Sequence, residues 1–76
     1  MLTNTNILNP KIKEEIFTYW SEDQTRKAVL MNNYGQPEIH FFKDGELEAI
    51  ESYDNHSMRY HEDAAENYVL GVKNFT

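Results

Sequence analysis

The segment PEIHFFKDGELEAIESY, residues 37–53, predicts two β-strands joined by a tight turn, and this hairpin decides the fold. Both halves contain β-branched and aromatic residues, which favour strands. The Asp44-Gly45 pair between them is a strong signal for a hairpin turn. If this pair alone forms a two-residue turn, Phe42 lies opposite Leu47, and the apolar side chains are divided between the two faces of the hairpin.

The second possible pairing is slipped by one residue, with Gly45 as a bulge that follows a turn at Lys43-Asp44. A one-residue slip moves every side chain of a strand to the opposite face. We expect the slipped pairing because it gathers a continuous apolar face, made up of Ile39, Phe41, Leu47 and Ala49. The opposite face then carries His40, Phe42 and Ile50.

The residues before the hairpin predict further strands. Asn9-Pro10 is a typical helix start, whereas residues 16–20 (IFTYW) are all β-branched or aromatic and favour a strand. We therefore expect a short helical turn over residues 10–14 with a strand after it. Composition further predicts a polar loop, a strand and a turn, at residues 21–25, 26–32 and 33–36.

The C-terminal third of the chain predicts one helix. Ser57 is a good N-cap, and Gly71 is a natural C′ residue, with Val72 as the hydrophobic contact of a Schellman ending. Helical spacing gives an apolar stripe wide enough to face a core, which consists of Met58, His61, Ala65, Tyr68, Val69 and Val72. We interpret His61 on this stripe as a hydrogen-bonded core residue.

Together these elements predict a single α+β domain over residues 1–76, a three- or four-stranded antiparallel β-meander with one C-terminal α-helix packed on one face. Residues 1–9 are expected to be loose unless they dock. One helix covers only one face of a sheet, and an open apolar face is unusual in a soluble monomer. The N-terminal segment, a second copy or another protein would then cover it. The candidate interface on this helix-free face consists of Tyr19, Met31, His40, Phe42, Glu48 and Ile50.

The charge distribution limits the class of partner. The chain has 76 residues and a net charge of −6, and residues 44–76 hold eight acids against two bases. Lysine and arginine bind phosphate backbones, so this acidic half disfavours nucleic acid as a ligand. The sequence has no cysteine, no apolar run long enough to span a membrane and no basic, apolar leader at its start. These features predict a cytoplasmic protein that does not enter a membrane.

Size and spacing disfavour an enzyme or a metal protein. A chain this short has little material for the walls of a cleft. His56 and His61 are five residues apart, which does not place two ligands on one helix face. Acid–base catalysis by Glu62, Asp63 and Glu66 would need an apolar pocket, which an exposed helix edge does not provide. We predict no catalytic, cofactor-binding or metal-binding residue.

The last part of the chain carries the pattern HS-x-x-Y-x-EDAAEN-aromatic-x-x-G. It is formed by His56, Ser57, Tyr60, Glu62, Asp63, Ala64, Ala65, Glu66, Asn67, Tyr68 and Gly71. With the strand-turn-strand before it, residues 41–72 resemble small orphan proteins encoded by bacteriophages, particularly marine phages of cyanobacteria. The resemblance implies a host cytoplasm and a protein that binds a host factor more often than it performs chemistry. It implies no cofactor and no catalytic residue.

Three functions are compatible with these patterns. We favour a non-enzymatic protein–protein interaction module that self-associates, as a homodimer, or binds a host protein through the helix-free sheet face. The second is an acidic inhibitor that mimics nucleic acid and blocks a nucleic-acid-binding protein. The third is a small metal-binding or enzymatic protein whose site forms at a subunit interface, for example with His40 beside His61 of a second copy.

Overall fold

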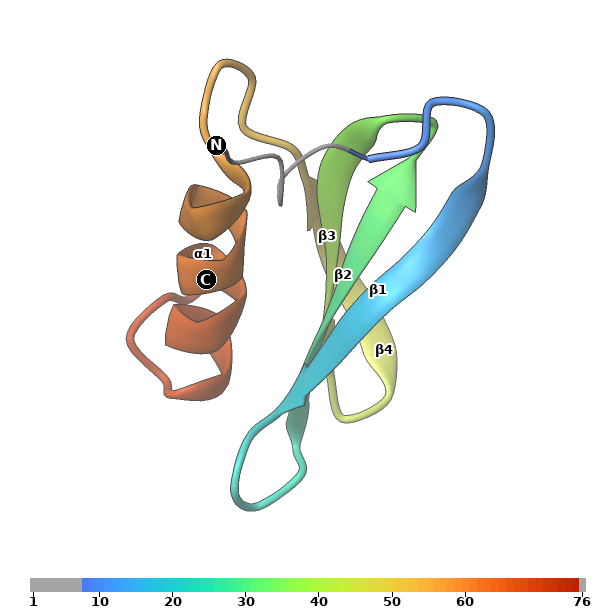
Figure 1. Ribbon diagram of the computed structural model, residues 1–76. Helices are drawn as coiled ribbons and strands as arrows, with labels where there is room; N and C mark the ends of the chain where they lie inside the picture. Colours follow the sequence, from blue (N-terminus) through green and yellow to red (C-terminus); the bar gives the residue numbers. More distant parts are fainter. Residues whose placement is uncertain (1–7, 76) are drawn as a thin grey trace.

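The four strands of the chain form one antiparallel sheet with a single helix on one side (Figure 1). The computed structural model describes residues 8–75. The elements in chain order are β1 (Lys13–Trp20), β2 (Arg26–Asn33), β3 (Gln36–Lys43), β4 (Glu46–Glu51) and α1 (Met58–Val69). Each strand pairs with the next, so the sheet order is β1-β2-β3-β4. This architecture confirms the predicted α+β meander with a C-terminal helix packed on one face.

The helical turn predicted over residues 10–14 is wrong. The side chain of Asn9 accepts the backbone N–H of Lys11 at 2.9 Å, which closes one turn only. The chain is a strand from Lys13 onward, and the backbone N–H of Tyr34 donates to the carbonyl of Ile12 at 3.1 Å. Strand propensity and pairing with β2 therefore outweigh the local helix-start signal.

The start of the described chain docks on the helix side of the sheet. Leu8 packs against the core, and the carbonyl of Asn9 accepts a hydrogen bond from the side chain of buried Asn32 at 2.9 Å. For the rest of the segment 1–9, which we expected to be loose unless docked, residues 1–7 lie outside the described residues.

The turn of the β3–β4 hairpin does not have the slipped pairing that we expected. Asp44 and Gly45 both have positive φ angles, 52° and 83°, as in a two-residue type I′ turn. Phe42 lies opposite Leu47, so the predicted pairing of Phe41 with Leu47 is wrong. The type I′ turn is favoured because its backbone twist matches the right-handed twist of paired strands.

A β-bulge just beyond the turn then shifts the register by one residue. Phe41 lies opposite Ala49, so Glu48 is the extra residue of β4. Phe41 therefore faces α1 and Phe42 faces away from it, as the sequence predicted. Leu47 differs from the prediction, because it shares the face of Phe42 and not that of Phe41.

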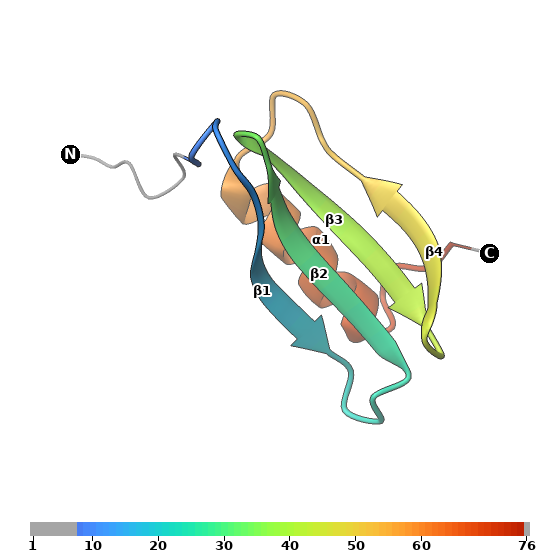
Figure 2. The ribbon, with the colours of Figure 1, turned by 90° about the vertical axis from the view of Figure 1, so that its right-hand side faces the viewer.

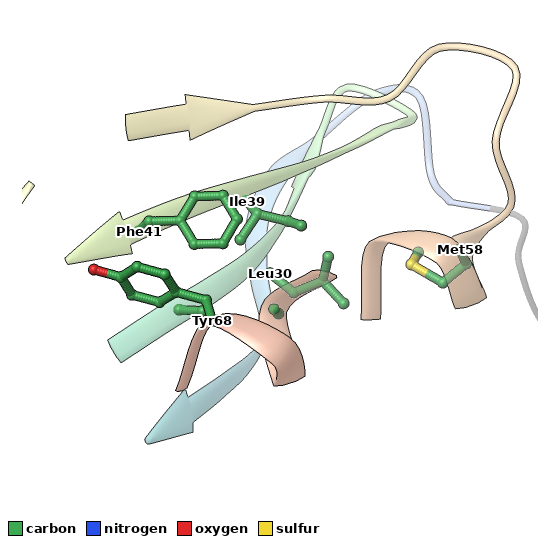
Figure 3. Close-up of a cluster of buried hydrophobic side chains, with 7 residues drawn as sticks. Leu30, Ile39, Phe41, Met58 and Tyr68 are labelled. Atoms are coloured by element: carbon green, nitrogen blue, oxygen red, sulfur yellow. The ribbon is translucent and has the colours of Figure 1, made fainter. Parts of the chain in front are cut away.

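The core lies between α1 and the central strands β2 and β3. Figure 3 shows the Phe41 ring of β3 beside the Tyr68 ring of α1, in an edge-to-face contact with centroids 4.9 Å apart. Phe75, from the tail after α1, adds a third ring at 4.8 Å from Phe41. The sequence analysis did not include Phe75 in the core. The buried members of the cluster are Ala28, Leu30, Ile39, Phe41, Met58, Ala65 and Tyr68.

Both ends of α1 have the predicted caps. The Ser57 side chain accepts the backbone N–H of Tyr60 at 3.2 Å. At the other end Gly71 has a φ of 85°, and the N–H of Val72 donates to the carbonyl of Asn67 at 2.9 Å, as in a Schellman ending. Val72 is nevertheless 72% exposed. Its place on the core stripe was wrong because the helix ends before it.

Arg26 of β2 holds the C-terminal tail against the rest of the domain. Its guanidinium donates to the backbone carbonyls of Tyr68 and Lys73, both at 3.0 Å, and to the side chain of Asn74. The bond to Tyr68 adds a second partner to a carbonyl in the last turn of α1, which also accepts the backbone N–H of Gly71, and the bond to Lys73 holds the tail. They also fold the tail back so that Phe75 reaches the core.

Candidate interaction surface

The face of the sheet opposite α1, named the outer face here, consists of alternate residues of all four strands. Figure 2 views the sheet from this side, with α1 behind it. Strand pairing aligns the residues of this face in rows that run across the sheet. The first row is Trp20, Lys27, Phe42 and Leu47, the second is Thr18, Val29, His40 and Ile50, and the third is Glu15, Met31 and Glu38.

Large apolar side chains of the outer face are open to solvent. Trp20 is 55% exposed, and Leu47 and Ile50 are each 51% exposed. They belong to the two edge strands, β1 and β4, so exposed apolar side chains lie at both edges of this face, with the partly exposed ring of Phe42 between them. In the part of the chain that the structure describes, no segment crosses this face (Figure 2).

Lys27 lies between two aromatic rings in the first row. Its Nζ is 4.5 Å from the ring centroid of Phe42 and 5.4 Å from that of Trp20. A cation is attracted to the face of an aromatic ring, and the methylene stem of lysine covers apolar surface. Lys27 therefore orders the two rings and brings a positive charge to the outer face.

Glu38 brings a negative charge to the third row. Its carboxylate lies 2.6 Å from Nε2 of His40 and accepts the side-chain amide of Asn33 at 3.0 Å. Strand pairing also places Lys13 and Glu15 on this face. The outer face thus carries two lysines and two glutamates, so its formal charge is balanced. The net charge of −6 lies on the other surfaces of the molecule.

Four of the six predicted interface residues lie together on the outer face, namely Met31, His40, Phe42 and Ile50. Tyr19 does not belong to this group, because it lies opposite Ala28 and packs against the core. Burial raises the pKa of Tyr19, and the carboxylates of Glu62, Glu66 and Asp63 on α1 raise it further. Placing Tyr19 on the helix-free face was wrong. Trp20, the next residue, faces outward instead.

Glu48 also does not lie with the other predicted interface residues on the outer face. The bulge in β4 lets its carboxylate accept a hydrogen bond from the hydroxyl of Tyr68, which also lies 3.0 Å from the carbonyl oxygen of Phe42. Burial raises the pKa of the Tyr68 hydroxyl, and the hydrogen bond to Glu48 raises it further. Glu48 therefore bonds a core side chain and lies outside the rows of the outer face.

Seven of the eleven residues in these rows are absent from the predicted interface, among them Trp20, Lys27 and Leu47. Strict alternation along β2 from Val29 could have found Lys27, because residues two apart share a face. Leu47 could not be found in this way, since its face depends on the turn type of the hairpin.

His61 is buried, and both of its ring nitrogens have partners. Nε2 accepts the backbone N–H of Tyr53 at 3.0 Å, and Nδ1 donates to the carbonyl of Ser57 at 2.8 Å. These partners fix the neutral tautomer and confirm His61 as a hydrogen-bonded core residue, with no lone pair left for a metal ion. Among residues 8–75, no group of three or more histidine, aspartate or glutamate side chains is arranged to hold a metal.

Several acids of the C-terminal half are engaged in internal contacts. The carboxylate of Glu51 accepts a hydrogen bond from the hydroxyl of Tyr53 at 2.6 Å and lies 3.3 Å from Nζ of Lys73. Burial raises the pKa of Tyr53, and the hydrogen bond to Glu51 adds to this shift. Asp63 pairs with Arg59 at 3.6 Å along the helix. Of these two acids, Glu51 is held by internal contacts, whereas the side chain of Asp63 remains 56% exposed.

Two open depressions lie away from the outer face. One, of about 530 Å³, lies between the β1–β2 loop and the end of α1 and contains Arg26, whose guanidinium already bonds backbone carbonyls. The other, of about 460 Å³, lies beside Tyr53 and Tyr60 and contains Lys73, which pairs with Glu51. The main cations of both depressions serve the fold, which does not favour a catalytic site in either.

Comparison with protein-family models, with curated proteins and with solved structures found no match for this chain. Among the described residues, no helix has the length and apolar character needed to cross a membrane. The functional assignment therefore depends on the geometry of the molecule itself.

Proposed function

We propose that this chain is a non-enzymatic interaction module that binds another protein through its outer face. The observation that carries the proposal is the exposure of Trp20, Leu47 and Ile50, which lie on one sheet face that no described segment covers. Exposed apolar side chains that gather on one face favour a protein interaction site.

The side chains of the outer face are of the types that contribute most to binding. Tryptophan and other aromatic residues are enriched among the residues that dominate interface energies. The strands are already fixed by pairing on both sides, or on one side at the edges. Binding to such a preformed surface requires little ordering of the backbone, which reduces the entropic cost of association.

A site-specific cross-linking experiment tests this proposal. A photo-reactive amino acid is placed at Ile50 on the outer face, or at Leu70, which is 69% exposed near the end of α1. We expect protein adducts from the Ile50 position in purified protein or in a lysate of the native host, and few from Leu70. Equal labelling from both positions would show that the outer face is not the preferred contact surface.

A further inference from the structure

We propose that the partner of the outer face is a second copy of this chain, stacked face to face about a two-fold axis that runs along the second row. This inference rests on the proposed function and specifies its partner. In this arrangement Lys27 of each copy lies near Glu38 of the other copy.

The charge distribution selects the outer face for self-association. The whole chain carries −6, whereas the outer face carries Lys13 and Lys27 against Glu15 and Glu38. Two copies that meet through other surfaces bring net negative charge together, which is unfavourable. The outer face combines exposed apolar side chains with a balanced charge.

The positions of the charges within the rows specify how the two copies stack. Lys27 lies in the first row and Glu38 in the third, on the adjacent strand, so opposite charges are at opposite ends of the face. A two-fold axis along the second row turns one copy so that its first row lies over the third row of the other. Lys27 then lies over Met31 of the second copy and one strand away from its Glu38. Strands are about 4.8 Å apart and stacked sheets about 10 Å apart, so the two backbones are about 11 Å apart, a distance that a lysine and a glutamate side chain span together.

The second row meets its own copy in this arrangement. Its residues on the central strands are Val29 and His40, and Ile50 lies on the edge strand β4. Val29 therefore meets Val29, and Ile50 meets Ile50, across the axis. The exposed ring of Trp20 and the partly exposed ring of Phe42 lie in the first row, where they contact Lys27.

The size of the face predicts a weak, reversible dimer. Four strands of six to eight residues, with about three or four outer-face positions on each, cover roughly 20 Å by 20 Å, or about 400 Å² in projection per copy. Side-chain relief increases this area, yet it remains at the lower end of the range for specific interfaces. We therefore expect a dissociation constant in the micromolar range, on the order of 1 to 100 μM.

A charge-exchange experiment tests the stacking, with dissociation constants measured by sedimentation equilibrium. Lys27→Glu and Glu38→Lys each place like charges together at both contacts of the symmetric dimer, and we expect each to weaken self-association about tenfold or more. An equimolar mixture of the two variants restores both opposite-charge contacts, so the mixed dimer should recover to within about threefold of the unaltered protein. Lys43→Glu and Glu46→Lys, at the β3–β4 turn, are controls that change the net charge by the same amounts.

Circular dichroism monitors the fold of each variant, because Glu38→Lys removes the contacts with His40 and Asn33. Weaker self-association of both single variants, with recovery of the dissociation constant in the mixture, supports the proposal. Single variants that weaken the dimer without recovery on mixing overturn the proposed stacking. A chain that stays monomeric up to about millimolar concentration overturns the second copy as partner but leaves the proposed function intact. A dimer that is insensitive to Lys27→Glu and to Ile50→Ser overturns both.

Discussion

The two faces of the sheet contain apolar residues from the same strands, yet they have different surroundings. On the face under α1, the side chains of Leu30, Ile39 and Phe41 are at most 1% exposed. On the outer face, Val29 is 6% exposed, whereas Ile50 is half exposed. Strand alternation supplies apolar side chains to both faces. Only one face has a helix to cover it, so apolar residues stabilise the fold on that face and are available to a partner on the other.

The largest expected contrast between the faces is that of Phe41 and its neighbour Phe42. Phe41→Ala removes a ring that is fully buried against Tyr68 and Phe75, and we expect the free energy of unfolding to fall by about 3–5 kcal/mol. Phe42→Ala removes a ring that is partly open on the outer face, and the expected loss is about 1 kcal/mol or less. Urea denaturation followed by circular dichroism measures both.

Self-association distinguishes the same two substitutions, because Phe42 lies on the outer face and Phe41 does not. A folded Phe42→Ala variant should self-associate less than the unaltered protein. If the two substitutions destabilised the fold equally, the outer face would be part of a closed core, and the contrast between the faces would be lost.

The next largest effect concerns the two histidines near the start of α1. His61→Leu leaves the backbone N–H of Tyr53 and the carbonyl of Ser57 without partners inside the domain, and we expect a loss of about 2–4 kcal/mol. His56 is exposed and stacks on the ring of Tyr60, with centroids 3.9 Å apart. His56→Leu should therefore change stability by about 0.5 kcal/mol or less. Thermal unfolding of the two variants side by side distinguishes a core histidine from a surface one.

The hydroxyl groups on the helix side of the sheet predict a loss of stability in alkali. Burial, followed by contact with Glu48 and Glu51 respectively, raises the pKa of Tyr68 and of Tyr53 above the ordinary value near 10. Below about pH 10 the folded and unfolded chains both hold these protons. At higher pH the unfolded chain releases protons that the folded chain keeps, so the free energy of unfolding decreases.

Urea titrations between about pH 9 and 11 measure this slope. Tyr68→Phe should make it shallower, whereas Tyr34→Phe, at an exposed turn position, should leave it nearly unchanged. A slope that is the same in the Tyr68→Phe variant would show that this hydroxyl does not hold its proton more tightly in the folded state.

The sequence predicted the faces of the sheet better than it predicted the pairing of the strands. Helical spacing placed Tyr68 in the core, and the predicted faces of Phe41 and Phe42 are confirmed although they were argued from a slipped pairing that the turn does not have. The pairing could not be inferred from the hairpin alone, because the type I′ turn at Gly45 is combined with a bulge at Glu48. The bulge accompanies a contact between Glu48 and Tyr68 of the helix, which local sequence does not reveal.

The residues that close the core at its C-terminal side were also beyond local inference. Phe75 follows the end of the helix, where no helical or strand periodicity continues, so the spacing of apolar residues cannot place it in the core. It reaches the core because Arg26, more than forty residues earlier, bonds the carbonyl of Lys73. Similarly, Tyr19 was placed on the wrong face because residues 16–20 are all β-branched or aromatic, so their pattern does not show which side chains face the helix. Contacts between distant segments decide such cases.

The smallest expected effect on stability concerns Lys27, and it separates the two roles of the outer face most clearly. Lys27→Met keeps an unbranched side chain over Trp20 and Phe42 but removes the charge. Exposed cation–π contacts contribute about 0.5–1 kcal/mol, and the thioether recovers part of this by contact with the rings. We expect the free energy of unfolding to change by about 0.5 kcal/mol or less. A loss of more than about 1 kcal/mol would show that Lys27 mainly orders the rings for folding, because desolvated cation–π contacts contribute about 2 kcal/mol. A negligible change in stability together with weaker self-association would assign the charge of Lys27 to recognition between the copies. Removal of a charge on which the fold depends would instead lower the free energy of unfolding.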